Sequence, residues 1–411
     1  MTEAMTTVTR TGTRGADRPP LLTRALLLRC VSIVGCSSGF FLLLAVVPLY
    51  AGEHGGGGAA GLATGALMAA TVAGELATPR LVARLGYRWT LGGGLVLLGA
   101  PALVLTVSGS VGWIVAVSVL RGLGFALAVV AGGALTAALI PPGRRGEGLA
   151  LIGVVGGVPG MLALPLGVWL AGRVGVTPVA VAAGAVVLAA VVTVPGLPDR
   201  AATATGDKSV GVVAGLRTPA LAGPALVFAA SALAAGVIPT FLPAAVPAGS
   251  GTLVALALLL QPAASTAVRW WAGRYGDRHG PARLVLPGLL LSAAGMALTA
   301  LTASPAAVLG GVTLFGVGFG IAQSATLTLM YARVEASSQA TVSALWNLAY
   351  DAGMGAGALL AAPVVAALGH PAAFALTAAV TATAVVPAVR DRRRFTQPVD
   401  SRTAAQGRTA A

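Results

Sequence analysis

The chain has 411 residues, of which 56% are hydrophobic and only 9% are charged. This composition excludes an ordinary soluble domain and indicates a membrane protein that crosses the bilayer several times. The formal net charge of +14 does not indicate nucleic-acid binding, because the Arg and Lys residues form short clusters between apolar runs rather than a basic domain.

Taken in chain order, the apolar runs predict an all-α membrane protein with twelve transmembrane helices. Each run is long enough to cross a hydrocarbon core of roughly 30 Å, which takes about 20 helical residues. The predicted spans are 25–49, 59–79, 89–108, 111–139, 148–171, 175–196, 219–246, 252–272, 284–303, 305–331, 337–368 and 371–389.

The polar segments between these runs divide the chain into domains. Residues 22–197 and 219–390 form two six-helix halves, joined by a polar linker at 198–218. Residues 1–21 and the basic segment 391–411 are predicted to be tails. Basic residues follow the even-numbered spans, whereas Arg173 alone follows an odd-numbered one, so we expect both termini to be cytoplasmic in a multi-pass protein of the plasma (inner) membrane. Arg29, near the start of the first span, is expected to snorkel to the interface.

A charged, glycine-containing segment occurs twice, once in each half. The second copy is GRYGDRHGPAR at Gly273–Arg283, and the first is PRLVARLGYR at Pro79–Arg88. Each lies between two apolar runs, and the second is predicted to be a tight hairpin loop. The two copies align so that Gly86 corresponds to Gly280. The distance along the sequence between these two glycines is termed the repeat offset. The first copy has Pro79 and Ala83 in place of the leading Gly and the Asp of the second copy.

This segment resembles the G-x-x-x-D-R-x-G-R/K-R/K signature of the major facilitator superfamily. The resemblance implies two pseudo-symmetric six-helix halves and a secondary transporter that works by alternating access. It also implies a gating role for the matching residues: Gly273, Asp277, Arg278, Gly280, Arg283, Arg84, Gly86 and Arg88.

The fifth span contains GVVGGVPGMLALPLG (Gly153–Gly167) and resembles the glycine-proline motif of the superfamily's proton antiporters, with Leu164 where a glycine is expected. Pro removes a backbone hydrogen bond and Gly removes bulk, so this helix can bend. Close helix packing is the alternative explanation. The motif residues are Gly153, Gly156, Gly157, Gly160, Pro165 and Gly167.

Two ionisable residues are predicted near the middle of the membrane. Asp351 lies about 15 residues into the eleventh span, where a charged group costs on the order of 3 kcal/mol, so it is a candidate for proton coupling. Arg121 lies about ten residues into the fourth span, in VLRGLG, which resembles the R-x-x-x-G motif that the family uses in proton transfer. Alternatively, Asp351 has a structural hydrogen-bonding role, to neighbouring helices or Arg121, and Arg121 is a fixed counter-charge.

Other polar residues inside the spans suggest a gate and a substrate cavity. Glu75 and Arg269 occupy equivalent positions in the repeat and could form a cytoplasmic gate, although Glu75 could simply snorkel to the interface. A cavity with so few polar groups suits amphipathic organic molecules better than sugars. The cavity candidates are Ser37, Gln261, Gln323, Trp346, Asn347 and Tyr350.

Together these features predict a proton-coupled exporter of a small amphipathic organic compound, resembling the drug and metabolite antiporter branch. An uptake permease for a small metabolite or sugar, or a sensor that has lost transport, are the alternatives. The sequence contains no P-loop and no acidic cluster for a metal-bound diphosphate, so we expect no enzyme activity, cofactor or metal. The expected partners are the substrate, protons and the bilayer, and the protein is expected to be monomeric.

Overall fold

The computed structural model describes residues 22–141, 145–199, 215, 217–247, 249–334 and 339–396. These residues are mainly helical, and none of them forms a strand. Residues 1–21 and 397–411 of the predicted tails, and most of the predicted linker, lie outside the described residues. The helices are α1 (Arg24–Leu44), α2 (Val46–Leu103), α3 (Val111–Leu139), α4 (Arg145–Val174), α5 (Val176–Val191), α7 (Pro219–Ala245), α8 (Gly251–His279), α9 (Ala282–Thr299), α10 (Pro305–Tyr331), α11 (Gln339–Thr383) and α12 (Val385–Thr396), with short 3₁₀ turns at Leu105–Val107 and Val194–Gly196.

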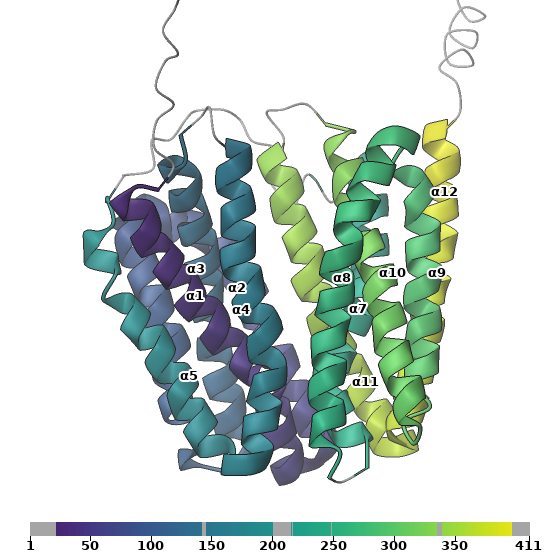
Figure 1. The fold of residues 1–411 in the computed structure, drawn as a ribbon, viewed down its shortest axis with the longest axis horizontal. Coiled ribbons are helices and arrows are strands. Elements are labelled where there is room, and N and C mark those ends of the chain that lie inside the picture. The colour runs from purple at the N-terminus through teal and green to yellow at the C-terminus, as the bar shows by residue number, and fades with distance from the viewer. Residues whose placement is uncertain are drawn as a thin grey trace, which may run out of the picture.

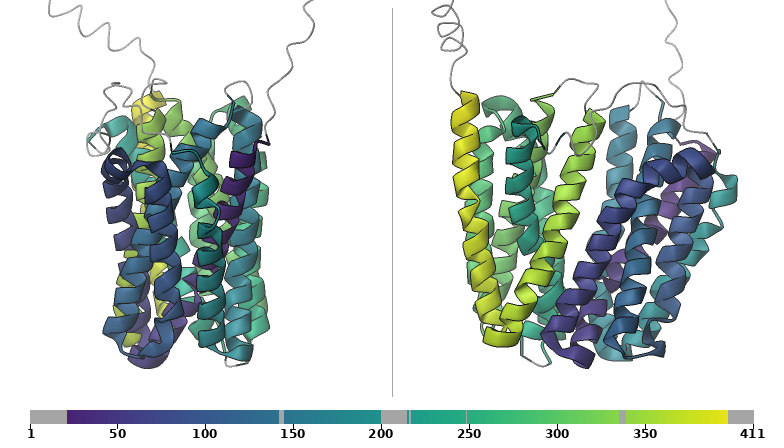
Figure 2. Two further views of the ribbon diagram at one scale, coloured as in Figure 1. Left: turned by 90° about the vertical axis from the view of Figure 1, so that its left-hand side faces the viewer. Right: turned by 180° about the vertical axis from the view of Figure 1, so that it is seen from behind.

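The helices form two bundles that stand side by side (Figure 1). Helices α1–α5 make the N-terminal half and α7–α12 make the C-terminal half. The start of α1 and the end of α12 lie at the same end of the molecule, here termed the terminal end, as Figures 1 and 2 show from three directions. The opposite end is termed the far end.

Nine segments of the described chain are long and apolar enough to cross a membrane. Two of them, Arg24–Val107 with 84 residues and Thr341–Asp391 with 51, are far longer than one crossing requires. Within them the helical backbone breaks at Gly56, Gly86 and Gly369. The count of twelve crossings therefore stays a prediction.

The turns between helices repeat along the chain. Gly86 and Gly280, which define the repeat offset, have φ of 79° and 86°, and Gly175 and Gly369, related by the same offset, have φ of 85° and 82°. Such angles favour glycine because a side chain would clash with the backbone. The prediction that all of Gly273–Arg283 forms a loop is wrong, since α8 continues to His279 and the chain turns at Gly280.

Packing inside each half repeats as well. A Cβ on Gly94 would lie 2.7 Å from the backbone nitrogen of Ala128, and a Cβ on Gly288 would lie 2.9 Å from that of Ala322. In the same two helix crossings, a Cβ on Gly124 or Gly318 would overlap a backbone nitrogen, that of Leu98 or Ser292. The repeat offset relates each of these positions to its equivalent in the other half. The small residues let the helix backbones touch, as is common in membrane bundles.

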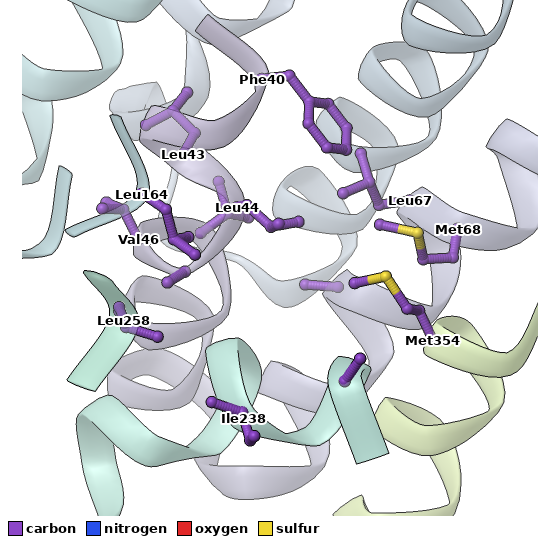
Figure 3. Close-up of a cluster of buried hydrophobic side chains, with 14 of the residues drawn as sticks. Phe40, Leu43, Leu44, Val46, Leu67, Met68, Leu164, Ile238, Leu258 and Met354 are labelled. Carbon is purple, nitrogen blue, oxygen red and sulfur yellow. The ribbon is translucent and has the colours of Figure 1, made fainter. Parts of the chain in front are cut away.

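The two halves meet through small residues and an apolar cluster. A Cβ on Gly61 of α2 would lie 2.5 Å from the carbonyl oxygen of Ala358 on α11, and the Thr240 hydroxyl of α7 donates to the Thr64 hydroxyl at 3.1 Å. Apolar side chains from both halves also converge in one buried cluster (Figure 3). This cluster, termed the interhalf seal, comprises Leu44, Met68, Leu164, Ile238, Leu258 and Met354.

Candidate functional site

A cavity of about 280 Å³ lies between the two halves. Its N-terminal wall is formed by α1 and by the glycine-rich face of α4, and its C-terminal wall by α7, α8, α10 and α11. Leu44, Leu164, Leu258 and Met354 of the interhalf seal also line it, so the seal closes one side of the cavity. The residues that contribute polar or aromatic groups are Phe41, Gln261, Ser265, Thr266, Arg269, Phe319, Gln323 and Tyr350.

The motif in α4 forms much of the N-terminal wall. Gly156, Gly157 and Gly160 line the cavity, and a Cβ on Gly157 or on Gly153 would meet no atom within 4 Å. Gly167, further along α4, packs against the backbone of Leu42. The glycines of the motif therefore serve two purposes, since some keep the cavity open and others let helices approach closely.

Two acidic residues meet where the halves touch. Glu75 of α2 and Asp351 of α11 bring their carboxyl groups within interaction distance of each other, and the Asp351 residue is 8% exposed. Their depths agree, because the stretch of α11 from Gln339 to Asp351 and the stretch of α2 from Glu75 to Gly86 are each about 17 Å of helix. The expectation that Glu75 snorkels is wrong, since α2 continues past position 79 and places Glu75 deeper in the bundle.

Arg269 occupies the position in α8 that Glu75 occupies in α2. Its exposed side chain lines the central cavity together with Tyr350. Glu75 and Arg269 do not form an ion pair in the described part of the chain. The two predicted gate residues are thus separated in this conformation, and Glu75 contacts Asp351 instead.

Arg121 is enclosed within the N-terminal half. The residue is 1% exposed, and its Nη2 donates to the Gly39 carbonyl oxygen at a long distance of 3.5 Å. Its Nε and Nη1 have no hydrogen-bond partner within the described residues. The ionisable group beside Asp351 is Glu75 rather than Arg121.

The remaining cavity candidates are divided among three environments. Gln261, Gln323 and Tyr350 line the central cavity. Ser37 lines a second cavity of about 350 Å³ between α1, α3 and α4. Trp346 stacks on Phe228 at 4.3 Å between ring centroids, and Asn347 is exposed and is not among the residues that line either cavity.

Sequence reasoning missed the role of Arg29, which does not snorkel. Arg29 is 5% exposed, and its Nε donates at 3.1 Å to both the Gly132 carbonyl oxygen and the Thr136 hydroxyl. Its Nη1 donates to the Ser32 hydroxyl at 2.7 Å. The spacing of Gly132 and Thr136, one turn apart on a neighbouring helix, is the one sequence signal for this site.

The predicted gating residues lie at the terminal end, around the turns at Gly86 and Gly280. Arg84, Arg278 and Arg283 are exposed and Arg88 is partly exposed, while the side chain of Asp277 lies outside the described residues. A Cβ on Gly86 would lie 2.6 Å from the Asp199 carboxylate. An acidic group therefore lies beside the first copy of the segment, although Ala83 replaces the Asp within it. No group of three or more His, Cys, Asp or Glu residues in the described part of the chain could hold a metal ion.

The sequence matches the Major Facilitator Superfamily over residues 30–358 and again over residues 224–409. These matches span most of the chain. The chain belongs to the Major Facilitator Superfamily. It is therefore a multi-pass membrane transporter rather than an enzyme. No curated protein is significantly similar to it in sequence.

Solved structures of other Major Facilitator Superfamily transporters share this fold. The nucleoside transporter NupG superposes with a TM-score of 0.74 at 14% identity, covering 92% of this chain and 100% of NupG. The xylose transporter XylE from E. coli, in a partially occluded inward-open conformation, gives 0.70 at 13% identity, covering 92% and 98%. The human organic anion transporter MFSD10 gives 0.59 at 19% identity, covering 90% and 100%. At these identities the similarity shows the fold, and it does not assign a substrate.

Proposed function

We propose that this chain is a twelve-helix, proton-coupled exporter of small amphipathic organic compounds in the inner membrane, with both termini in the cytoplasm. The observation that carries the proposal is the close approach of the carboxyl groups of Glu75 and Asp351 at the contact between the halves. Two ionised carboxylates at this contact would repel each other, whereas a carboxyl group that keeps its proton can donate it to its neighbour, so the contact favours retention of one proton. The pair is therefore a binding site for one proton.

The position of the pair couples this proton to the movement of the halves. Glu75 belongs to the N-terminal half and Asp351 to the C-terminal half, so loss of the proton leaves two negative charges facing each other across the contact. At a separation of about 4 Å and an effective dielectric constant of about 20, two unit charges repel by on the order of 4 kcal/mol. Proton release therefore favours separation of α2 from α11 at this depth, and protonation favours their contact.

The proton site and the cavity are also adjacent. Tyr350 lines the cavity and Asp351 is the next residue of α11. A substrate that contacts Tyr350 can thus change the position of the neighbouring carboxyl group. The partial antiporter motif in α4, whose glycines form the opposite wall, supports export as the direction. Uptake with protons is the alternative.

The test is transport by purified protein in proteoliposomes with an imposed pH gradient, using cationic, neutral and anionic amphipathic compounds. We expect at least one compound to move against the proton flow. Asp351→Asn and Glu75→Gln should each abolish gradient-driven accumulation and leave exchange of labelled for unlabelled substrate intact, because exchange needs no net proton transfer. Glu53→Gln, which removes an exposed carboxyl group of the N-terminal half, is the matched control and should behave as wild type.

Each alternative result has a defined meaning. Movement of the compound together with protons would establish uptake instead of export. Accumulation that is unchanged in both carboxyl variants would show that the pair is structural. Absence of any transport in well-folded wild-type protein would support the sensor alternative.

A further inference from the structure

The central cavity contains one charged side chain among its described lining residues, and that charge is positive. Arg269 extends from α8 into the cavity, whereas Glu75 and Asp351 do not line it. The lining therefore offers a cationic group to an anionic ligand and no acidic group to an organic cation. This bias is not visible in the composition of the spans, where acidic and basic residues both occur.

Arg269 also lacks the kind of protein partner that several other arginines of the bundle have. Arg29 is hydrogen-bonded to α3, and Arg333 forms an ion pair with Asp391 at 2.7 Å. Arg274, five residues after Arg269 on the same helix, stacks on Trp270 at 3.8 Å. Within the described residues, Arg269 makes no hydrogen bond and no ion pair. A guanidinium group with five donors in one plane is thus available to a ligand.

The surroundings of Arg269 suit a ligand with an aromatic or apolar body. Phe319 and Tyr350 line the cavity, and behind them Phe228 stacks between Phe319, at 5.9 Å, and Trp346, at 4.3 Å. Gln323 and the hydroxyl groups of α8 add a few hydrogen-bonding groups. A volume of about 280 Å³ is at the small end of the range for ligand sites, which matches a compound of two or three rings.

We propose that the cavity binds a small aromatic organic anion, such as an arylcarboxylate, whose anionic group is held by Arg269. This inference rests on the proposed transport function and names its substrate class. Arg269 forms two parallel hydrogen bonds with a carboxylate, and the ring system packs against Phe319 and Tyr350. The bound anion also neutralises Arg269, which lowers the free energy of closing the two halves over an otherwise unpaired charge.

The proposal is tested by equilibrium binding to purified protein in lipid nanodiscs, with three ligands of matched shape. These are 2-naphthoate, the neutral 2-naphthamide and the cationic 2-naphthylmethylammonium. We expect the carboxylate to bind most tightly. Arg269→Gln should weaken carboxylate binding by about tenfold to a hundredfold, the effect typical of a lost charge-assisted hydrogen bond. It should leave the amide unchanged, and Arg269→Lys should restore part of the difference.

Arg274→Gln is the matched control, because it removes the same charge from the same helix outside the cavity. It should not alter the binding of any of the three ligands. Equal affinity of wild-type protein for the three ligands, preference for the cation, or no saturable binding of the carboxylate would each overturn the proposal without the need for a variant.

The same preparations separate this inference from the proposed function. If neutral compounds are driven by the proton gradient and the carboxylate neither binds nor moves, the substrate class is wrong and the transport mechanism stands. If the carboxylate binds through Arg269 but no gradient drives its movement, the binding site stands and proton coupling fails.

Discussion

The two contacts between the halves occupy equivalent places in the repeat but differ in chemistry. Along α2 and α11, small residues bring the backbones together, and the carboxyl groups of Glu75 and Asp351 lie beside each other. Along α4 and α8, the equivalent positions are Gly157 and Arg269, which face an open cavity. In the function proposed above, the first contact binds the proton and the second supplies the positive charge for the substrate. A transporter built from two similar halves can in this way bind its proton and its substrate at different contacts while the two backbones stay alike.

The repeat preserves backbone contacts inside each half more closely than it preserves charge. Gly94 and Gly124 pack against backbone nitrogens of the N-terminal half. Gly288 and Gly318 pack against the equivalent nitrogens of the C-terminal half. In contrast, buried Arg121 of the N-terminal half corresponds to buried Phe315. The repeat offset relates Arg333 to Leu139 and Asp391 to Leu197, so two leucines occupy the positions of this ion pair in the N-terminal half. Charge is thus the feature by which the halves have become specialised, and three sets of variants test this comparison.

The largest expected effect on the free energy of unfolding concerns the ion pair of Arg333 and Asp391. Among the described residues, the N-terminal half has no equivalent of this pair. The Arg333 and Asp391 side chains are 9% and 12% exposed and form two hydrogen bonds, at 2.9 and 2.7 Å. Arg333→Leu leaves the aspartate without its partner and should lower the free energy of unfolding by about 3 kcal/mol. Adding Asp391→Leu, which copies the apolar N-terminal half, should recover most of this loss. Chemical unfolding in detergent measures both, and a double variant no more stable than the single one would contradict the comparison.

A smaller effect is expected where the halves are alike. Gly124→Ala and Gly318→Ala each force a Cβ onto a backbone nitrogen and should each destabilise the protein by about 2 kcal/mol, within the usual cost of overpacking. Gly93→Ala is the control, because its Cβ would meet no atom within 4 Å and alanine favours helix. A large difference between the two clashing variants, measured by thermal unfolding, would show that the crossings are not equivalent.

Sequence reasoning located much of this architecture because local features encode it. The charged segment at Gly273–Arg283 has a weaker copy in the first half, and the offset between the two copies also relates the turn glycines and the helix crossings. Polarity selected six cavity candidates, of which Gln261, Gln323 and Tyr350 line the central cavity and three do not, and a role in binding substrate stays a prediction for all of them. The same charged segment also led to the prediction of the family.

The partners of the buried charges were not predictable in the same way. In helices this rich in alanine and glycine, apolar residues cover every face, so hydropathy does not reveal which side faces a neighbour. The prediction for Glu75 depended on the end of its helix, and the continuation of α2 beyond Pro79 moved it deeper. Arg29 bonds to a backbone carbonyl that any residue could supply, so its partner left little trace in the sequence.

The smallest expected change concerns Arg121, whose equivalent in the other half is phenylalanine. With two guanidinium nitrogens lacking partners in the described structure, Arg121 is a net cost to folding. Arg121→Met replaces the side chain by an uncharged, unbranched one of similar volume and should raise the free energy of unfolding by about 1 kcal/mol. If Arg121 takes part in proton transfer, as the family motif implies, the same variant should lose gradient-driven transport. Unfolding and flux measured on one preparation would then change in opposite directions, whereas a loss of stability would show that Arg121 has a structural partner in another conformation.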